Sequence, residues 1–142
     1  MLLGTYRYYP LTFELDKECN RYAVKVHGVG MTDGDDLEDG RQMAKALVFD
    51  VAASCFEDHK IFSGASECEQ ATEILDIGID AALKLMLRNI LVKKKVSQNK
   101  LAKLLGVSEM SMSQYLNVKK STKVDILTQC FEILGKPLKI SC

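Results

Sequence analysis

The 142-residue sequence has no tryptophan, two prolines and two histidines, and only 7% of its residues are aromatic. Its five cysteines are odd in number and widely spaced: Cys19, Cys55, Cys68, Cys130 and Cys142. None of them belongs to a C-x-x-C pair, so the sequence predicts neither a disulfide framework nor a zinc site. Because His27 and His59 are also isolated, we expect no metal and no other cofactor.

The sequence also lacks a long hydrophobic run. Its most apolar stretch, residues 81–92, is short and is interrupted by Lys84, Arg88 and Asn89, which excludes a helix that crosses a bilayer. The first three residues are followed at once by polar ones, so no secretory leader is expected. We expect a cytoplasmic protein with no membrane partner.

A net charge of zero hides an uneven distribution of charge. Residues 1–80 hold 7 Lys/Arg and 16 Asp/Glu, a net charge of −9, and residues 81–142 hold 12 and 3, a net charge of +9. Such asymmetry favours two modules with different partners, nucleic acid for the basic half and a basic protein for the acidic half.

Residues 96–118 have the pattern of two short helices joined by a tight turn. Ser97 and Ser108 are good N-caps, and Gly106 can adopt the positive φ that ends a helix. The apolar positions recur at helical spacing: Leu101, Leu104 and Leu105, then Met112, Tyr115 and Leu116. The pattern predicts a helix-turn-helix, and the alternative is a helical hairpin in an ordinary bundle.

The charges around this pair favour DNA binding, because residues 93–123 contain eight lysines and a single acid, Glu109. The outward positions of the second helix are the predicted base contacts: Glu109, Met110, Ser111 and Gln114. The predicted phosphate contacts flank them: Gln98, Lys100, Lys119, Lys120 and Lys123. We expect the partner to be double-stranded promoter DNA.

The acidic half has the alternation of strands. Residues 5–16 and 21–29 alternate apolar and polar side chains, which predicts an antiparallel hairpin, with Pro10 at the start of its strand or on an edge. A short third strand is expected around Met31. A helix follows from Asp36, its predicted N-cap, with an apolar stripe at Leu37, Ala44, Leu47, Val48, Val51, Ala52 and Cys55.

Five carboxylates crowd the turn before this helix: Asp33, Asp35, Asp36, Glu38 and Asp39. They lack the spacing of a calcium-binding loop. Helix capping with a solvated acidic rim is therefore the preferred interpretation over a metal site. Such a rim also suits a cationic partner.

The remaining segments complete an α+β fold. Residues 57–72 are expected to form a loop, residues 73–79 a strand, and Asp80 to about Lys95 a helix with Asp80 as its cap. The predicted domains are residues 1–79 and 80–142. A last helix is expected after Ser121 and Thr122, which offer an N-cap, with inward positions Val124, Leu127, Cys130, Phe131 and Leu134.

The tail after Pro137 alternates like a strand. An isolated strand is unstable, so Leu138 and Ile140 are predicted to pair with a two-fold copy in a homodimer or a higher even oligomer. A frayed tail is the alternative.

Several blocks of sequence resemble the HicB family of antitoxins in its helix-turn-helix variant. The strongest lie at residues 101–108 (LAKLLGVS), 121–127 (STKVDIL) and 134–140 (LGKPLKI), and weaker ones at residues 9–13 (YPLTF) and 34–39 (GDDLED). The resemblance implies a small, incomplete RNase H-like α/β domain, made of antiparallel strands and a helix. It also implies an all-α DNA-binding domain with a C-terminal strand.

The resemblance further implies that the acidic domain binds and neutralises a small basic RNA-cleaving toxin, and that the basic domain represses its own operon. It places the five clustered carboxylates on the toxin-facing surface. Catalysis is not predicted, because metal-assisted hydrolysis needs carboxylates that converge from several elements. Two alternatives to the antitoxin remain: first, a ligand-responsive regulator without a toxin partner, and after it a nuclease or other enzyme.

Overall fold

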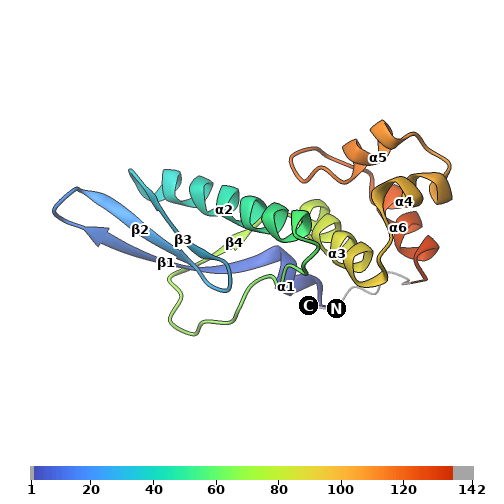
Figure 1. Ribbon diagram of the computed structural model, residues 1–142. Coiled ribbons are helices and arrows are strands. Elements are labelled where there is room, and N and C mark those ends of the chain that lie inside the picture. The colour runs from blue at the N-terminus through green and yellow to red at the C-terminus, as the bar shows by residue number, and fades with distance from the viewer. Residues whose placement is uncertain (1, 136–142) are drawn as a thin grey trace.

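The computed structural model, which describes residues 2–135, has an α+β fold with a four-stranded antiparallel sheet (Figure 1). The sheet has the order β3-β2-β1-β4 and is built from β1 (Tyr8–Asp16), β2 (Arg21–Val26), β3 (Gly30–Gly34) and β4 (Glu73–Asp76). The helices of the described part are α1 (Leu3–Arg7), α2 (Leu37–Glu57), α3 (Ile79–Lys94), α4 (Gln98–Leu105), α5 (Glu109–Tyr115) and α6 (Val124–Ile133).

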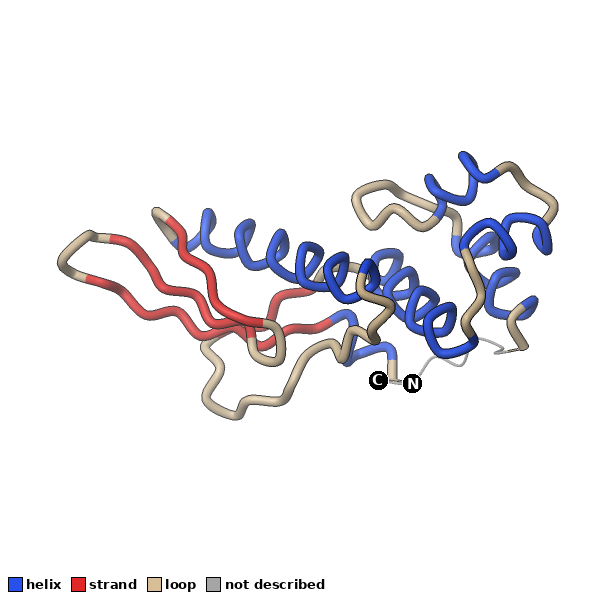
Figure 2. The backbone as a smooth tube through the Cα atoms, viewed as in Figure 1, coloured by secondary structure: helices blue, strands red, loops and turns tan. Residues whose placement is uncertain are grey.

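The elements form an elongated molecule in which α3 occupies the middle. Helix α2 lies along one face of the sheet, and the loop of residues 58–72 runs on the other side (Figure 2). Helices α4, α5 and α6 gather at the end of the molecule away from the β1–β2 turn (Figure 1).

The predicted hairpin and the short third strand are confirmed. Strand β1 pairs antiparallel with β2 in a register that sets Phe13 opposite Val24, and β2 pairs with β3 through Val24 and Thr32. The predicted strand at residues 73–79 is also present but shorter, because residues 77 and 78 turn the chain into α3.

The start of the first strand was predicted wrongly. Residues 5–7 belong to α1 rather than to a strand, because burial of Leu3 and Tyr6 in the core stabilises this short helix. Pro10 is neither the first residue of β1 nor on an edge strand, since β4 pairs with β1 at Pro10. The proline is tolerated because β2 has already ended on its other side, where the His27 N–H donates to the Pro10 carbonyl at 3.1 Å.

Gly40 permits the close approach of α2 to the sheet. A Cβ atom added at Gly40 would lie 2.9 Å from Phe13 Cε1 and 3.1 Å from Val24 Cγ2. The predicted stripe of α2 is otherwise buried or packed against the core. The exception is Leu37, the first residue of α2, which is 39% exposed.

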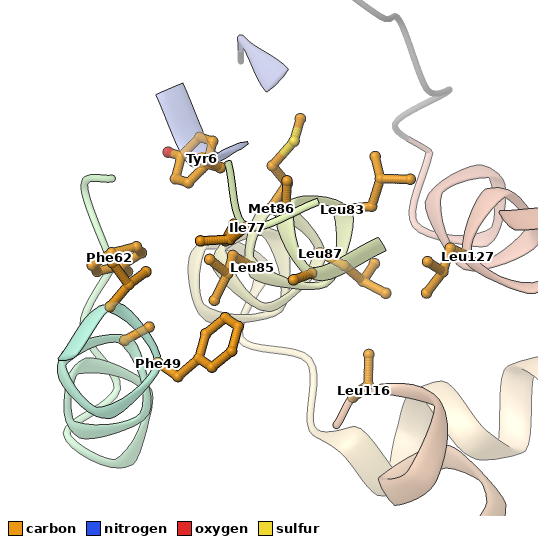
Figure 3. Close-up of a cluster of buried hydrophobic side chains, with 14 of the residues drawn as sticks. Tyr6, Phe49, Phe62, Ile77, Leu83, Leu85, Met86, Leu87, Leu116 and Leu127 are labelled. Carbon is orange, nitrogen blue, oxygen red and sulfur yellow. The ribbon is translucent and has the colours of Figure 1, made fainter. Parts of the chain in front are cut away.

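Helix α3 is buried on almost every side. Between residues 81 and 91 its apolar residues are all buried: Ala81, Ala82, Leu83, Leu85, Met86, Leu87, Ile90 and Leu91. The N-cap is Gly78 rather than the predicted Asp80. The core is continuous around this helix, from Phe49 of α2 to Leu116 and Leu127 of the C-terminal part (Figure 3). The boundary predicted at residue 79 remains a prediction.

Three expectations for the C-terminal part are corrected. Leu104 is 53% exposed and Val124 44% exposed, because each lies on the outer side of a helix whose core contacts are made by its neighbours. Neither Ser121 nor Thr122 caps α6, whose N-cap position is Lys123 without a side-chain hydrogen bond. The predicted dimer residues Leu138 and Ile140 lie outside the described residues.

No helix within residues 2–135 combines the length and the apolar character needed to cross a membrane.

Asn89 joins α3 to two N-terminal segments. Its side chain is fully buried, and Oδ1 accepts a hydrogen bond from the Phe62 N–H at 2.9 Å. Its Nδ2 donates to the Phe62 carbonyl at 2.8 Å and to the Tyr6 hydroxyl at 3.2 Å. One amide therefore satisfies both backbone groups of Phe62 and fixes the loop of residues 58–72 to the core.

We predict that Asn89→Leu lowers the free energy of unfolding by about 2–4 kcal/mol, because it leaves two buried backbone groups of Phe62 unpaired. Urea denaturation monitored by circular dichroism measures the change. The matched control is Asn99→Leu at an exposed position of α4, which should change stability little. Equal effects of the two substitutions would contradict the assigned role.

Candidate nucleic-acid interface and acidic surface

Helices α4 and α5 are joined by three residues whose geometry follows from the sequence. The Ser97 and Ser108 side chains accept hydrogen bonds from the backbone N–H of Lys100 and Ser111, as predicted for N-caps. Gly106 has a φ of +78° and ends α4, and the N–H groups of Gly106 and Val107 both bond to the Ala102 carbonyl.

The packing of α5 leaves one side free. Met112 and Leu116 are buried beneath it, and Ala102 of α4 is buried as well, so the two helices approach closely. The predicted base-contact residues Glu109, Met110 and Gln114 are exposed, with Met110 at 73%. Ser111 is half-buried, and its hydroxyl lies 3.0 Å from the Ser108 hydroxyl, so it takes part in the cap.

The predicted phosphate contacts lie in α4 and in the segment that follows α5. Lys100, Lys119, Lys120 and Lys123 are exposed and Gln98 is half-buried. Lys94, which the sequence placed among the flanking cations, donates to the Leu134 carbonyl and joins α3 to the end of α6. Lys100, Lys119, Lys120 and Lys123 form a basic surface over α4 and the segment after α5.

A buried lysine holds that segment in place. Lys84 of α3 is fully buried, and its Nζ donates to the carbonyl oxygens of Asn117, at 2.8 Å, and Lys120. Asp80 lies one turn earlier, with Oδ1 3.1 Å from Lys84 Nζ in an ion pair. Its Oδ2 accepts from the Thr122 N–H at 2.9 Å. The Asp80–Lys84 pair therefore fixes residues 117–122, which carry Lys119 and Lys120.

Sequence reasoning missed this pair. It treated Lys84 as an interruption of an apolar run and Asp80 as a cap. The available signal was that Lys84 lies between Leu83 and Leu85 in a helix that is apolar around its whole circumference, where a charged group must find partners.

The acidic surface is partly neutralised from within the chain. Arg21 of β2 bonds to Asp33 at 3.2 Å and to Asp35, and these two carboxylates, with Asp35 first, raise the pKa of Arg21. Arg41 of α2 pairs with Glu38 at 3.2 Å and with Glu73 of β4. The hydrogen bond to Glu73 is the main cause that raises the pKa of Arg41.

The other two carboxylates serve the start of α2. Asp36 Oδ1 accepts from the Asp39 N–H at 2.8 Å, as predicted for an N-cap, and Asp39 Oδ2 accepts from the Asp35 N–H at 2.9 Å. Acids at this end of a helix are also favoured by its dipole. The five residues are thus brought together at one end of the sheet, with Asp33, Asp35 and Glu38 more than 60% exposed.

Within the described part of the chain, no group of three or more His, Cys, Asp or Glu side chains has an arrangement that could hold a metal ion. The cysteines predicted to pack as small apolar residues do so: Cys55 contacts the core and Cys130 is buried. Burial raises the pKa of the Cys130 thiol to about 11, so this cysteine is protonated at neutral pH.

Comparison with known proteins gives a consistent result over both halves. The chain is 27% identical over 134 residues to "Antitoxin HicB 2" of Photorhabdus laumondii, covering 93% of this chain and 94% of the relative. It is 25% identical over 135 residues to "Antitoxin HicB 1" of the same organism, covering 94% and 85%. It is 22% identical over 110 residues to "Antitoxin HicB" of Escherichia coli K12, covering 78% and 80%. No protein-family model matches the chain.

The fold is that of an α+β protein with a sheet-bearing acidic half and a helical basic half joined through α3. The similarities to the HicB antitoxins extend over most of the chain and confirm the resemblance predicted from the sequence. The chain is thus similar to HicB antitoxins in both its acidic and its basic half.

We predict that Lys84→Met lowers the free energy of unfolding by about 3–5 kcal/mol, because it leaves Asp80 without its buried cation. Adding Asp80→Asn should make the total loss smaller than the sum of the single losses, because the uncompensated charge disappears. Lys93→Met at an exposed position of the same helix is the control. Additive losses in urea denaturation would contradict the coupling.

Proposed function

We propose that the protein is an antitoxin that neutralises a small basic RNA-cleaving toxin and represses its own operon by binding promoter DNA. The observation that carries this proposal is the similarity to HicB antitoxins over up to 94% of the chain. The charge division supports it, since a protein that grips RNA presents cations that the acidic half can attract.

The DNA-binding part of the proposal is supported by α4 and α5. We infer that they act as a helix-turn-helix, with α5 as the recognition helix in the major groove. Exposed Glu109, Met110 and Gln114 then face base edges, and the basic surface faces phosphates. We also propose a cytoplasmic homodimer or higher even oligomer, in which a strand containing Leu138 and Ile140 pairs with its copy and sets the half-site spacing.

Gln114→Ala and Lys120→Ala should weaken DNA binding in different ways. Gln114→Ala should cost about 1–3 kcal/mol on the promoter fragment upstream of its own gene and little on random DNA, because it removes a base contact. Lys120→Ala should weaken both DNAs alike and reduce the salt slope by about 1, because it removes a phosphate contact. Fluorescence anisotropy at several salt concentrations separates the two.

The matched controls are Gln129→Ala, an exposed glutamine of α6, and Lys60→Ala, an exposed lysine of the acidic half. Both should leave DNA binding unchanged. If Gln114→Ala and Lys120→Ala lowered promoter and random binding by equal factors, the assignment of base and phosphate contacts would be wrong.

For the toxin-facing surface, we predict that the double change Asp33→Asn, Asp35→Asn weakens toxin binding about tenfold at low salt, mainly through a slower association rate. The two changes leave Arg21 without its carboxylates, so the local net charge changes from −1 to +1 and repels a basic partner. The probe is the product of a small basic reading frame next to this gene, measured by surface plasmon resonance and by rescue of growth arrest.

The control is Asp50→Asn, Asp58→Asn, which removes the same charge at exposed positions outside this surface. Asp36 and Asp39 are unsuitable because they cap α2. The full chain should be used, since a fragment ending at residue 80 would lose Asn89 and its bonds to Phe62. Equal weakening by the test and control variants would place the toxin elsewhere.

A further inference from the structure

A pocket of about 520 Å³ lies between the acidic and basic halves. Phe49, Ala53 and Phe56 of α2 form one wall, Arg88 of α3 contributes to the base, and Leu116 and Lys119 at the end of α5 form the other wall. Figure 3 shows Phe49 and Leu116 approaching α3 from these two different elements. Pockets of this size at the junction of two parts of a protein are frequent ligand sites.

Arg88 gives the pocket its chemical character. The guanidinium is half-buried and lies over the Phe56 ring, with 5.8 Å from Cζ to the ring centroid. Its Nη2 reaches the Leu116 carbonyl only at 3.5 Å, and no carboxylate within residues 2–135 lies in ion-pair distance of it. Burial lowers the pKa of Arg88. The guanidinium is partly desolvated, and its five N–H donors have one weak partner, the Leu116 carbonyl. Such a group favours the binding of an anion.

The other lining groups narrow the class of anion. Phe49, Phe56 and Leu116 offer apolar and aromatic surface to a ring. Of the other charged lining groups, Asp50 and Glu57 are acidic and Lys119 is basic, so together with Arg88 the lining carries no net positive charge that would favour a polyanion, while one anionic group can pair with Arg88. We propose that this pocket binds a small aromatic monoanion, with its carboxylate or sulfonate on Arg88 and its ring between Phe49, Phe56 and Leu116.

Such a ligand would also couple the two halves. It touches α2 on one side and, through Ser113 and Leu116, the proposed recognition helix on the other. Binding therefore changes the free energy of arrangements in which α5 lies at different distances from α2, and DNA affinity changes with it. This regulatory step rests on the proposed DNA-binding function, whereas the pocket and its ligand class do not.

The test titrates the full chain with anilinonaphthalene sulfonate, an aromatic monoanion whose fluorescence rises in apolar sites. Its uncharged analogue N-phenylnaphthylamine is the matched probe. We expect saturable binding of one sulfonate probe per chain. Arg88→Met should weaken the sulfonate probe at least tenfold and the uncharged probe by a clearly smaller factor. Ala53→Trp, which fills the pocket, should weaken both probes at least tenfold.

Ala46→Trp is the control, because Ala46 is exposed on the same helix and does not line the pocket. Circular dichroism and thermal unfolding establish whether each variant is folded. If Arg88→Met does not fold, Ala53→Trp still tests whether the probes bind in the pocket. Probe binding that is the same in wild type, Ala53→Trp and Ala46→Trp overturns the proposed pocket. Equal loss of both probes in Arg88→Met overturns the assigned anion.

Promoter binding with and without the sulfonate probe tests the coupling. A change of at least threefold in promoter affinity that Ala53→Trp abolishes supports it. If the probe binds and promoter affinity does not change, the proposed pocket stands and the proposed coupling to DNA binding is wrong. Probe binding without any promoter binding overturns the proposed DNA-binding function and leaves the pocket, so the two failures are distinguishable.

Discussion

The need to satisfy two polar side chains inside α3 determines how the molecule is assembled. Lys84 and Asn89 are both fully buried in a helix that is otherwise apolar on nearly every side. A buried polar group without a hydrogen-bond partner lowers the stability of the fold. Each of these two residues therefore requires a segment with polar groups to pack beside it. Asn89 bonds to Phe62 in the loop of residues 58–72. Lys84 donates to the carbonyls of Asn117 and Lys120 in the segment after α5. One helix thereby fixes an element from each half.

This arrangement explains how a −9 half and a +9 half coexist in one chain. Helix α3 packs against α1 and α2 on one side and against α6 on the other, so apolar contacts around α3 hold the halves together. The exposed lysines of the basic surface remain free of acidic partners among the described residues, since the ion pairs there join Lys84 to Asp80 or lie in the acidic half. The lysines of the basic surface therefore stay available for the DNA phosphates of the proposed function.

Local sequence signals predicted the parts of the fold that depend on neighbouring residues. Ser97, Ser108, Asp36 and Gly106 end or begin helices as expected, because caps are decided within four residues. The antiparallel hairpin was predicted from the alternation of apolar and polar residues, and its register is seen only in the folded sheet. The short helix α1 was missed because its stability comes from burial of Leu3 and Tyr6 in the core, a tertiary effect that no local pattern in five residues reveals.

Less of the candidate site could be predicted from the sequence, because most of its contacts also depend on tertiary packing. Exposure of Glu109, Met110 and Gln114 follows from helical spacing. The pairing of Arg21 with Asp33 and Asp35, and the bonds of Lys84 to residues 117–120, join positions that are 12 to 36 residues apart. Such contacts depend on the strand register and on the packing of α3, so they emerge only once the chain is folded.

The internal pairing of the acidic surface limits what that surface can contribute to recognition. Arg21 already lies between Asp33 and Asp35, so this group carries a net charge of only −1 toward an approaching cation. The attraction over longer distances must come from the whole charge of residues 1–80, which acts within a Debye length of about 8 Å at physiological salt. That field accelerates encounter with any basic protein, and it cannot by itself select one. In the proposed toxin complex, selectivity must therefore come from the shape of the sheet edge and from the positions at which Arg21 and Arg41 leave carboxylate oxygens uncovered.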